Sequence, residues 1–212
     1  MQIDVITDSV CPWCFIGKRR LEQALALRPH ITPDIKWKAF LLNPEIPAEG
    51  LDRTNYLVRK FGSESRVRRI YGTIADAGLS VEIEFAFERI DKTPNSIDSH
   101  RLILKAQEQG VAEHVVEALF NAFFREGRDI GDKAMLVKIG VDHGLDRKTL
   151  IRYLETDEDV SAIYDQNANA HRLGVNGVPA FIFNHDWIIS GAQEPQVLAR
   201  MLDAANAAEN AA

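Results

Sequence analysis

The chain has 212 residues, and its 25 lysine and arginine residues against 31 aspartate and glutamate residues give a net charge of −6. Apolar residues make up 46% and charged residues 26%, a globular composition that excludes a disordered or fibrous chain. The acidic balance argues against nucleic-acid binding. The sequence contains no run of about 18 apolar residues, which is the length that predicts a membrane span.

The first predicted elements form a β-α-β unit. Residues 2–7 are rich in β-branched side chains and predict a strand. Pro12 is favoured at the first position of a helix, and apolar residues at three- and four-residue steps predict a helix that ends before Pro29. Residues 35–41 alternate between apolar and charged side chains and predict the second strand. The start of the chain lacks the pattern of a secretory signal, so we expect a cytoplasmic protein.

A helical block and a β-β-α unit follow. After the loop at 44–50, apolar residues recur at helical spacing for about 120 residues. Residues 180–183 and 187–190 flank a turn and predict a hairpin. The last helix is expected to begin near Pro195 and to fray in the alanine-rich tail at 204–212.

Only two cysteines occur, Cys11 and Cys14, and both stand at the start of the first predicted helix. Free backbone N–H groups and the positive end of the helix dipole stabilise a thiolate on Cys11, which predicts the nucleophile. Three residues make almost one helical turn, so Cys14 lies beside Cys11 and is predicted to resolve a mixed disulfide. Pro12 rigidifies the pair between them, and Trp13 offers an aromatic contact for a partner or a shield for the sulfur.

Two other interpretations of the cysteine pair were considered. A zinc site needs four ligands, and the six histidines are scattered without helical pairing, so no metal is expected. Two inert buried thiols are the other alternative, but the pair stands at a strand-to-helix junction instead of within a core face.

The chain resembles the DsbA family of thioredoxin-fold proteins, and within it the FrnE-like branch of predicted dithiol-disulfide isomerases. Four segments carry the resemblance: DSVCPWCFIG at 8–17, PNSIDSHRL at 94–102, GVNGVPAF at 174–181 and ISGAQ at 189–193.

This resemblance implies an α/β fold of the thioredoxin type, with a large all-helical domain inserted after the second strand. Residues 1–50 and 174–212 would form the thioredoxin-like domain, and residues 51–173 the inserted domain. The attacking and resolving roles would fall to Cys11 and Cys14, as the residues themselves suggest.

Two further positions are assigned by the resemblance. Pro179 matches the cis-proline of the family, and Val178 before it would present its backbone to an extended substrate. An ordinary proline at a strand entry is the alternative for Pro179.

The remaining candidates are polar residues expected near the active-site groove. The resemblance places Asn95, His100 and Arg101 there, although capping of the following helix and a buried helix histidine are simpler interpretations. Gln193 is a further candidate, with a turn residue as the alternative.

These observations favour a thiol-disulfide oxidoreductase or isomerase that acts on protein or small-molecule thiols and disulfides. No cofactor is expected, with glutathione as an alternative co-substrate, and the sequence predicts no oligomeric state. One rival is a glutathione-dependent isomerase or transferase of the kappa-class or 2-hydroxychromene-2-carboxylate isomerase type, in which a serine typically replaces Cys11. Another is a non-catalytic, redox-sensitive module that binds client proteins at the edge formed by Val178 and Pro179.

Overall fold

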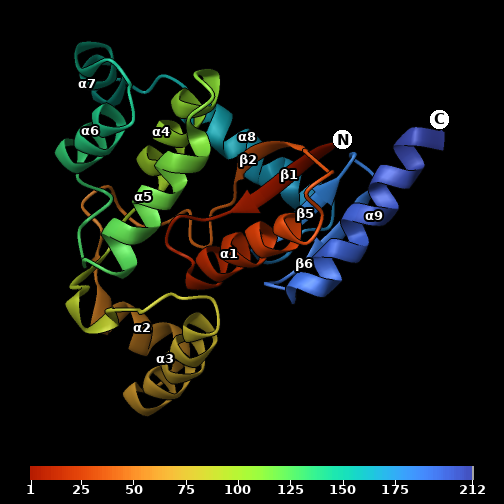
Figure 1. Ribbon diagram of the computed structural model, residues 1–212. Helices are drawn as coiled ribbons and strands as arrows, with labels where there is room; N and C mark the ends of the chain where they lie inside the picture. The colour runs from red at the N-terminus through yellow and green to blue at the C-terminus, as the bar shows by residue number, and fades with distance from the viewer. Residues whose placement is uncertain (212) are drawn as a thin grey trace.

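A computed structural model describes residues 1–211 (Figure 1). The strands are β1 (Gln2–Thr7), β2 (Asp34–Ala39), β3 (Leu51–Asp52), β4 (Lys92–Thr93), β5 (Ala180–Phe183) and β6 (Trp187–Ser190). The helices are α1 (Pro12–Ala26), α2 (Arg53–Phe61), α3 (Glu64–Leu79), α4 (Ile97–Glu108), α5 (Ala112–Phe124), α6 (Lys133–Asp142), α7 (Arg147–Glu155), α8 (Val160–Arg172) and α9 (Pro195–Ala211), with a short 3-10 helix at Phe87–Arg89.

The central sheet is built from both ends of the chain. Its strand order is β2-β1-β5-β6, with β1 parallel to β2 and the other neighbours antiparallel. The elements α2 to α8 lie between β2 and β5 in the sequence, and the fold expected from the sequence, an α/β thioredoxin type, is confirmed.

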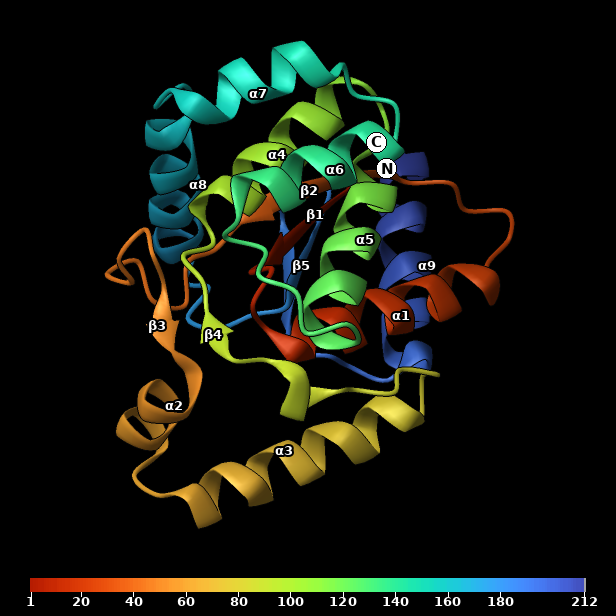
Figure 2. The same ribbon diagram turned by 90° about the vertical axis from the view of Figure 1, so that its left-hand side faces the viewer.

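Helices cover both faces of this sheet because its strands are apolar on both sides. Phe181 and Phe183 point into the main core with Phe15 of α1 and Leu198 of α9. On the opposite face, alternate strand residues pack with a residue of α8; these are Ile6, Ala180, Ile182 and Ala170. Helix α1 packs on the main core and contacts α9, α3 and α5 (Figure 2).

The middle segment forms two groups of helices on either side of the start of α1. Helices α4, α5, α6 and α7 pack on one another, and α5 also contacts α1. Helices α2 and α3 form a separate pair that projects from the rest, and α3 contacts α1 (Figures 1 and 2).

Three details differ from the sequence-based expectation. Strands β3 and β4 form a small antiparallel sheet within the predicted helical block, and two residues each are too few to show the alternation of a strand. Helix α8 packs on β2 of the central sheet as well as on α4. The last helix continues through Ala211, so most of the tail expected at its frayed end is helical, whereas residue 212 lies outside the described residues; the ammonium of Met1 pairs with Glu209 of this helix at 2.7 Å.

Among residues 1–211, no helix combines the length and the apolar character needed to span a lipid bilayer.

Candidate active site

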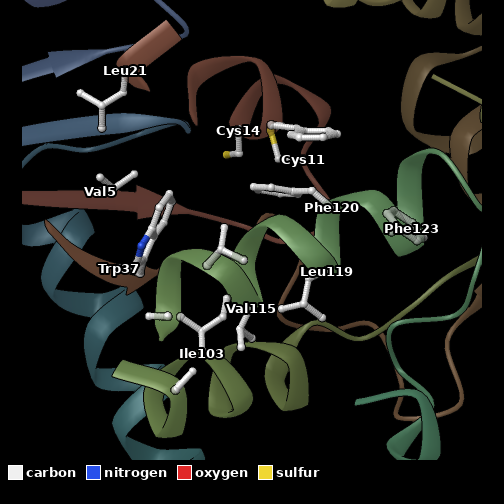
Figure 3. Packing of buried hydrophobic residues seen from close by; sticks show 14 of the residues in the cluster. Val5, Cys11, Cys14, Leu21, Trp37, Ile103, Val115, Leu119, Phe120 and Phe123 are labelled. Carbon is white, nitrogen blue, oxygen red and sulfur yellow. The ribbon is translucent and has the colours of Figure 1, made fainter. Parts of the chain in front are cut away.

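Cys11 is the N-cap of α1, and its backbone is extended with φ −98° and ψ 114°. Its N–H donates to the carbonyl of Asp8 at 3.0 Å, and its own carbonyl accepts from the N–H of Cys14 at 3.0 Å. Pro12 takes the first helical position, where its missing N–H leaves no donor unsatisfied. This turn brings the two cysteines side by side at the start of α1, with Phe120 of α5 below them (Figure 3).

Both cysteines are free thiols, and both are buried in the main core. Burial raises the pKa of the Cys14 thiol well above its ordinary value, and the neighbouring Cys11 adds to the rise. The Thr7 hydroxyl and the Asp8 backbone act in the opposite direction. Cys14 therefore holds its proton more firmly than an exposed thiol does.

The loop before β5 lies directly against this turn. The Val178–Pro179 peptide bond is cis, and Cys11 Sγ lies 3.6 Å from the carbonyl oxygen of Val178. Pro179 is buried against Gly17 of α1, where a Cβ atom would come within 2.6 Å of Pro179 Cγ. The structure thus brings together Cys11, Cys14, Val178 and Pro179.

The turn that precedes Cys11 is anchored by buried side-chain hydrogen bonds. Asp8, which is 1% exposed, accepts from the N–H of Val10 at 3.3 Å and from that of Leu42 at 2.8 Å. His100 of α4 lies nearby, with Nε2 3.5 Å from Asp8 Oδ1. These contacts fix the turn between β1 and α1 to the loop after β2 and to the start of α4.

The neighbouring Ser9 is also buried and hydrogen-bonds Ser99, whose hydroxyl donates to the carbonyl of Ser96 at 2.8 Å. Asp8 and Ser9 lie within the segment at 8–17, but no role for them follows from the sequence. A short polar run between a buried strand and a helix start was the available signal, because buried polar groups need partners.

The expected groove residues fall in different places. His100 is buried behind Asp8, and Asn95 is half-buried, where it donates to the carbonyl of Ile46 at 2.6 Å and accepts from the N–H of Ile97 at 2.9 Å. Asn95 thus bonds the first turn of α4, as the capping interpretation predicts. Gln193 is half-buried and donates to the carbonyl of Ser190 at 2.7 Å, as a turn residue does.

Arg101 lies within the helical segment and not at a groove. Its side chain is 1% exposed, and it pairs with Asp98 at 2.6 Å. Its remaining donors reach three backbone carbonyls, those of Tyr153, Thr156 and Glu158. This position does not fit the substrate contact expected for Arg101 from the sequence, because the side chain is buried, pairs with Asp98 within α4 and otherwise joins α4 to the segment around α7.

Pro12 and Trp13 are half-buried between the two cysteines, and Trp13 packs on the main core. They keep part of their surface in solvent beside Cys11, which is 4% exposed. Among residues 1–211, no three histidine, cysteine, aspartate or glutamate side chains are grouped as a metal ion requires.

Comparison with known proteins gives one family and one curated relative. The model of the DsbA-like thioredoxin domain matches residues 2–203. The uncharacterized protein YwbO of Bacillus subtilis (strain 168) is 26% identical over 204 residues, which cover 95% of this chain and 96% of that protein.

Several solved structures share the fold over almost the whole chain. A probable DsbA oxidoreductase from Streptomyces coelicolor has a TM-score of 0.89 and 27% identity, and covers 97% of this chain and 89% of its own. A 2-hydroxychromene-2-carboxylate isomerase has a TM-score of 0.71 and 18% identity, and the match covers 100% of this chain and 98% of the isomerase chain. The cytosolic disulfide reductase DsbM from Pseudomonas aeruginosa, solved with GSH, has a TM-score of 0.66 and 16% identity, and the match covers 96% of this chain and 98% of the DsbM chain.

Proposed function

The chain belongs to the family of DsbA-like thioredoxin domains, and we propose that it is a thiol-disulfide oxidoreductase that works through Cys11 and Cys14. The observation that supports this most strongly is the unequal placement of the two thiols. Cys11 stands at the helix start with its sulfur 3.6 Å from the Val178 carbonyl, whereas Cys14 is buried behind it with a raised pKa. This arrangement supports Cys11 as the nucleophile and Cys14 as the thiol that resolves the mixed disulfide.

In the reducing direction, the Cys11 thiolate attacks one sulfur of a substrate disulfide. A Cys11–substrate disulfide forms, and the other substrate sulfur leaves as a thiolate that takes a proton from water. Cys14 then gives its proton to solvent and attacks Cys11 Sγ. The Cys11–Cys14 disulfide forms, the second substrate thiolate leaves, and two electrons have passed from the protein dithiol to the substrate.

The loop at Val178 supplies the substrate contact in this proposal. The Val178 carbonyl accepts from the Cys11 thiol in the reduced protein, and the Val178 N–H has no acceptor among residues 1–211. An extended substrate segment can therefore add a backbone hydrogen bond there, as strand addition does at a sheet edge. Pro179 offers no backbone donor of its own, so the pairing is expected to be limited to Val178.

We propose a reducing compartment for this chain, as for the cytosolic disulfide reductase whose fold it shares. Such a compartment keeps the dithiol reduced, which favours reduction or isomerisation of substrates over their net oxidation. Glutathione is then the proposed partner that returns the Cys11–Cys14 disulfide to the dithiol, through the same steps in reverse.

The rival function is glutathione-dependent isomerisation or transfer on a small molecule, because the fold is shared with a 2-hydroxychromene-2-carboxylate isomerase. That chemistry needs no resolving thiol. Turnover of an aromatic or electrophilic substrate with glutathione that survives Cys14→Ala would favour the rival.

The test of the proposed function measures insulin disulfide reduction in the presence of a thiol reductant. We expect Cys11→Ser to reduce the rate to that of the reductant alone, because the one thiol that remains, Cys14, is buried and has a raised pKa. Ser161→Ala, at an exposed position of α8 outside the turn that holds Cys11, is the control and should keep the parent activity. Parent-like activity of Cys11→Ser would overturn the mechanism.

A further inference from the structure

The two edges of the central sheet differ in how their outer backbone groups are used. At the β2 edge, backbone N–H groups of alternate residues donate to side-chain amides of α4 and α8 at 2.7 to 2.8 Å. The donors are Trp37, Ala39 and Leu41, and the acceptors are Gln107 on α4 and Gln166 and Asn167 on α8. Such cover, like charged side chains or proline in the strand, prevents an edge from pairing with another strand. Strand β6, at the opposite edge, contains neither a charged residue nor a proline.

The pairing of β6 with β5 shows which backbone groups of β6 point outward. The N–H of Gly191 donates to the carbonyl of the residue before β5 at 2.7 Å. Because hydrogen-bonded positions recur at every second residue of an antiparallel pair, the backbone groups of Ile188 and Ser190 point away from β5. The carbonyl of Asp186 also points outward, because it shares a peptide unit with the N–H of Trp187, which faces β5. The pairing of β5 with β1 on its other side has the complementary alternation.

Only part of this outer edge is satisfied within the chain. The N–H of Asp186 donates to the carbonyl of Phe183 at 3.1 Å, and the carbonyl of Ser190 accepts from the side chain of Gln193 at 2.7 Å. The other outward groups are the N–H and the carbonyl of Ile188, the N–H of Ser190 and the carbonyl of Asp186. They have no hydrogen bond among residues 1–211, so β6 can still pair with a further strand.

A second copy of β6 matches these groups in one antiparallel register. With a two-fold axis at Ile188, the N–H and the carbonyl of each Ile188 pair with those of the other copy. The N–H of Ser190 then faces the carbonyl of Asp186 in the second copy, and the axis repeats this bond in reverse. The two outward groups that remain, the N–H of Asp186 and the carbonyl of Ser190, are the ones that already have partners.

The side chains also match in this register. Trp187 and Ile188, which are 36% and 40% exposed, would lie opposite Ile189 and Ile188 of the second copy. Aromatic and β-branched residues that face each other across strands stabilise a sheet. Each Asp186 carboxylate would lie opposite a Ser190, so no like charges face each other.

We infer that β6 is the contact edge of a homodimer, in which the central sheets of two copies join through antiparallel β6 strands into one continuous sheet. This inference goes beyond the proposed function and does not depend on it. It favours a second copy over a strand of another protein, because the free donors and acceptors of β6 complement one another about a two-fold axis. Through Gly191 and the Pro179 carbonyl, the contact edge is connected to the loop beside Cys11.

The first test measures molar mass by light scattering after size-exclusion chromatography, at protein concentrations from about 1 to 100 μM. The wild type is expected to be dimeric at the upper end of this range. Ile188→Lys places two ammonium groups opposite each other at the axis, and we expect it to raise the dissociation constant at least about tenfold. Ile151→Lys is the matched control, because Ile151 of α7 is 37% exposed and its change adds the same charge. This control should stay dimeric.

The second test examines the register by cross-linking, in a Cys11→Ser, Cys14→Ser background that has no native thiol. Hydrogen-bonded residues that face each other across antiparallel strands have Cα atoms about 5.5 Å apart, within the range of a disulfide. Ile188→Cys is therefore expected to form a disulfide-linked dimer on mild oxidation. Trp187→Cys is the control, since the two copies of residue 187 would be offset by two positions and lie more than about 7 Å apart.

The contrary outcomes are equally specific. A wild type that is monomeric over the whole concentration range would overturn the inference, whatever other strand β6 then accepts. A dimer that Ile188→Lys and Ile151→Lys weaken equally would also overturn it, because the contact would lie elsewhere. Faster cross-linking of Trp187→Cys than of Ile188→Cys would contradict the register. None of these results bears on thiol exchange, which a monomer can also perform.

Discussion

At the scale of single residues, burial keeps the Cys14 thiol neutral. Cys14 is 2% exposed, and desolvation is the largest cause of its raised pKa. A thiol that keeps its proton is a poor nucleophile, so Cys14 stays inert until a mixed disulfide on Cys11 lies beside it. The order of the two attacks then follows from burial.

Because the pKa of Cys14 is raised in the folded protein, we expect the free energy of unfolding to depend on pH. In the unfolded chain this thiol loses its proton near the ordinary value of 9.0, whereas the folded protein keeps it. The folded state therefore binds more protons above pH 9, and the stability that the neutral Cys14 contributes is present below that pH and is lost as the pH rises. We expect the difference in free energy of unfolding between the reduced wild type and Cys14→Ala to shrink above pH 9, by about 1.4 kcal/mol per pH unit.

Urea unfolding of both proteins at pH 7 and pH 10, with a phosphine reductant, measures this difference. The same comparison in a Cys11→Ser background removes the interaction between the two thiols, and the titration of the remaining shared groups then cancels. A difference that is the same at both pH values would contradict the burial of Cys14 as a neutral thiol.

The chemistry of Cys11 and Cys14 was open to prediction from sequence because it depends on local spacing at a helix start. The partners of Arg101 could not be predicted from the sequence, since three of them are backbone carbonyls of a segment more than 50 positions away. The same holds for Asp8, whose acceptor role depends on the loop at Leu42. Backbone partners leave no pattern of side chains to recognise.

At the scale of elements, α1 and the loop before β5 fit each other at one glycine. A side chain at Gly17 would press on Pro179, whose position is fixed by the buried strand that follows. Close packing of this kind tolerates little added volume. The smallest residue is therefore required one turn after Cys14.

We predict that Gly17→Ala destabilises the protein by about 1–3 kcal/mol and slows exchange, because the added methyl group must displace Pro179 from Cys11. Gly72→Ala is the control, since Gly72 is an exposed position in α3 with no atom near an added Cβ. That change should stabilise the protein by about 0.5–1 kcal/mol, from helix propensity alone. Thermal unfolding and exchange assays on both variants check the contrast, and equal effects at the two glycines would argue against the close contact.

Strands and helices with long, regular patterns were predicted well, as β1, α1 and the β5–β6 hairpin demonstrate. The pairing of β3 with β4 was not predicted, because each strand is two residues long and its stability depends on a neighbour 40 positions away. The packing of α8 on β2 also depends on tertiary contacts, since a helical pattern alone does not say which element covers the apolar face.

At the scale of the whole molecule, the site lies where three parts of the chain meet. The start of the chain supplies Cys11 and Cys14, the end supplies Val178 and Pro179, and the middle segment supplies α3 and α5, which contact α1. Asp8 and Ser9 tie the first part to α4. The domain limits at 50/51 and 173/174 stay a prediction, and the short sheet that begins at Leu51 is consistent with a change of structure there.

The central claim is that Cys11 receives the substrate sulfur and Cys14 resolves it. Intact-mass measurement of Cys14→Ala and Cys11→Ala after reaction with oxidised glutathione tests this claim most directly. We expect Cys14→Ala to gain one glutathione adduct at Cys11 rapidly, while the buried thiol left in Cys11→Ala reacts at least about a hundredfold more slowly. Equal rates of adduct formation in the two variants, or no adduct on Cys14→Ala, would contradict it.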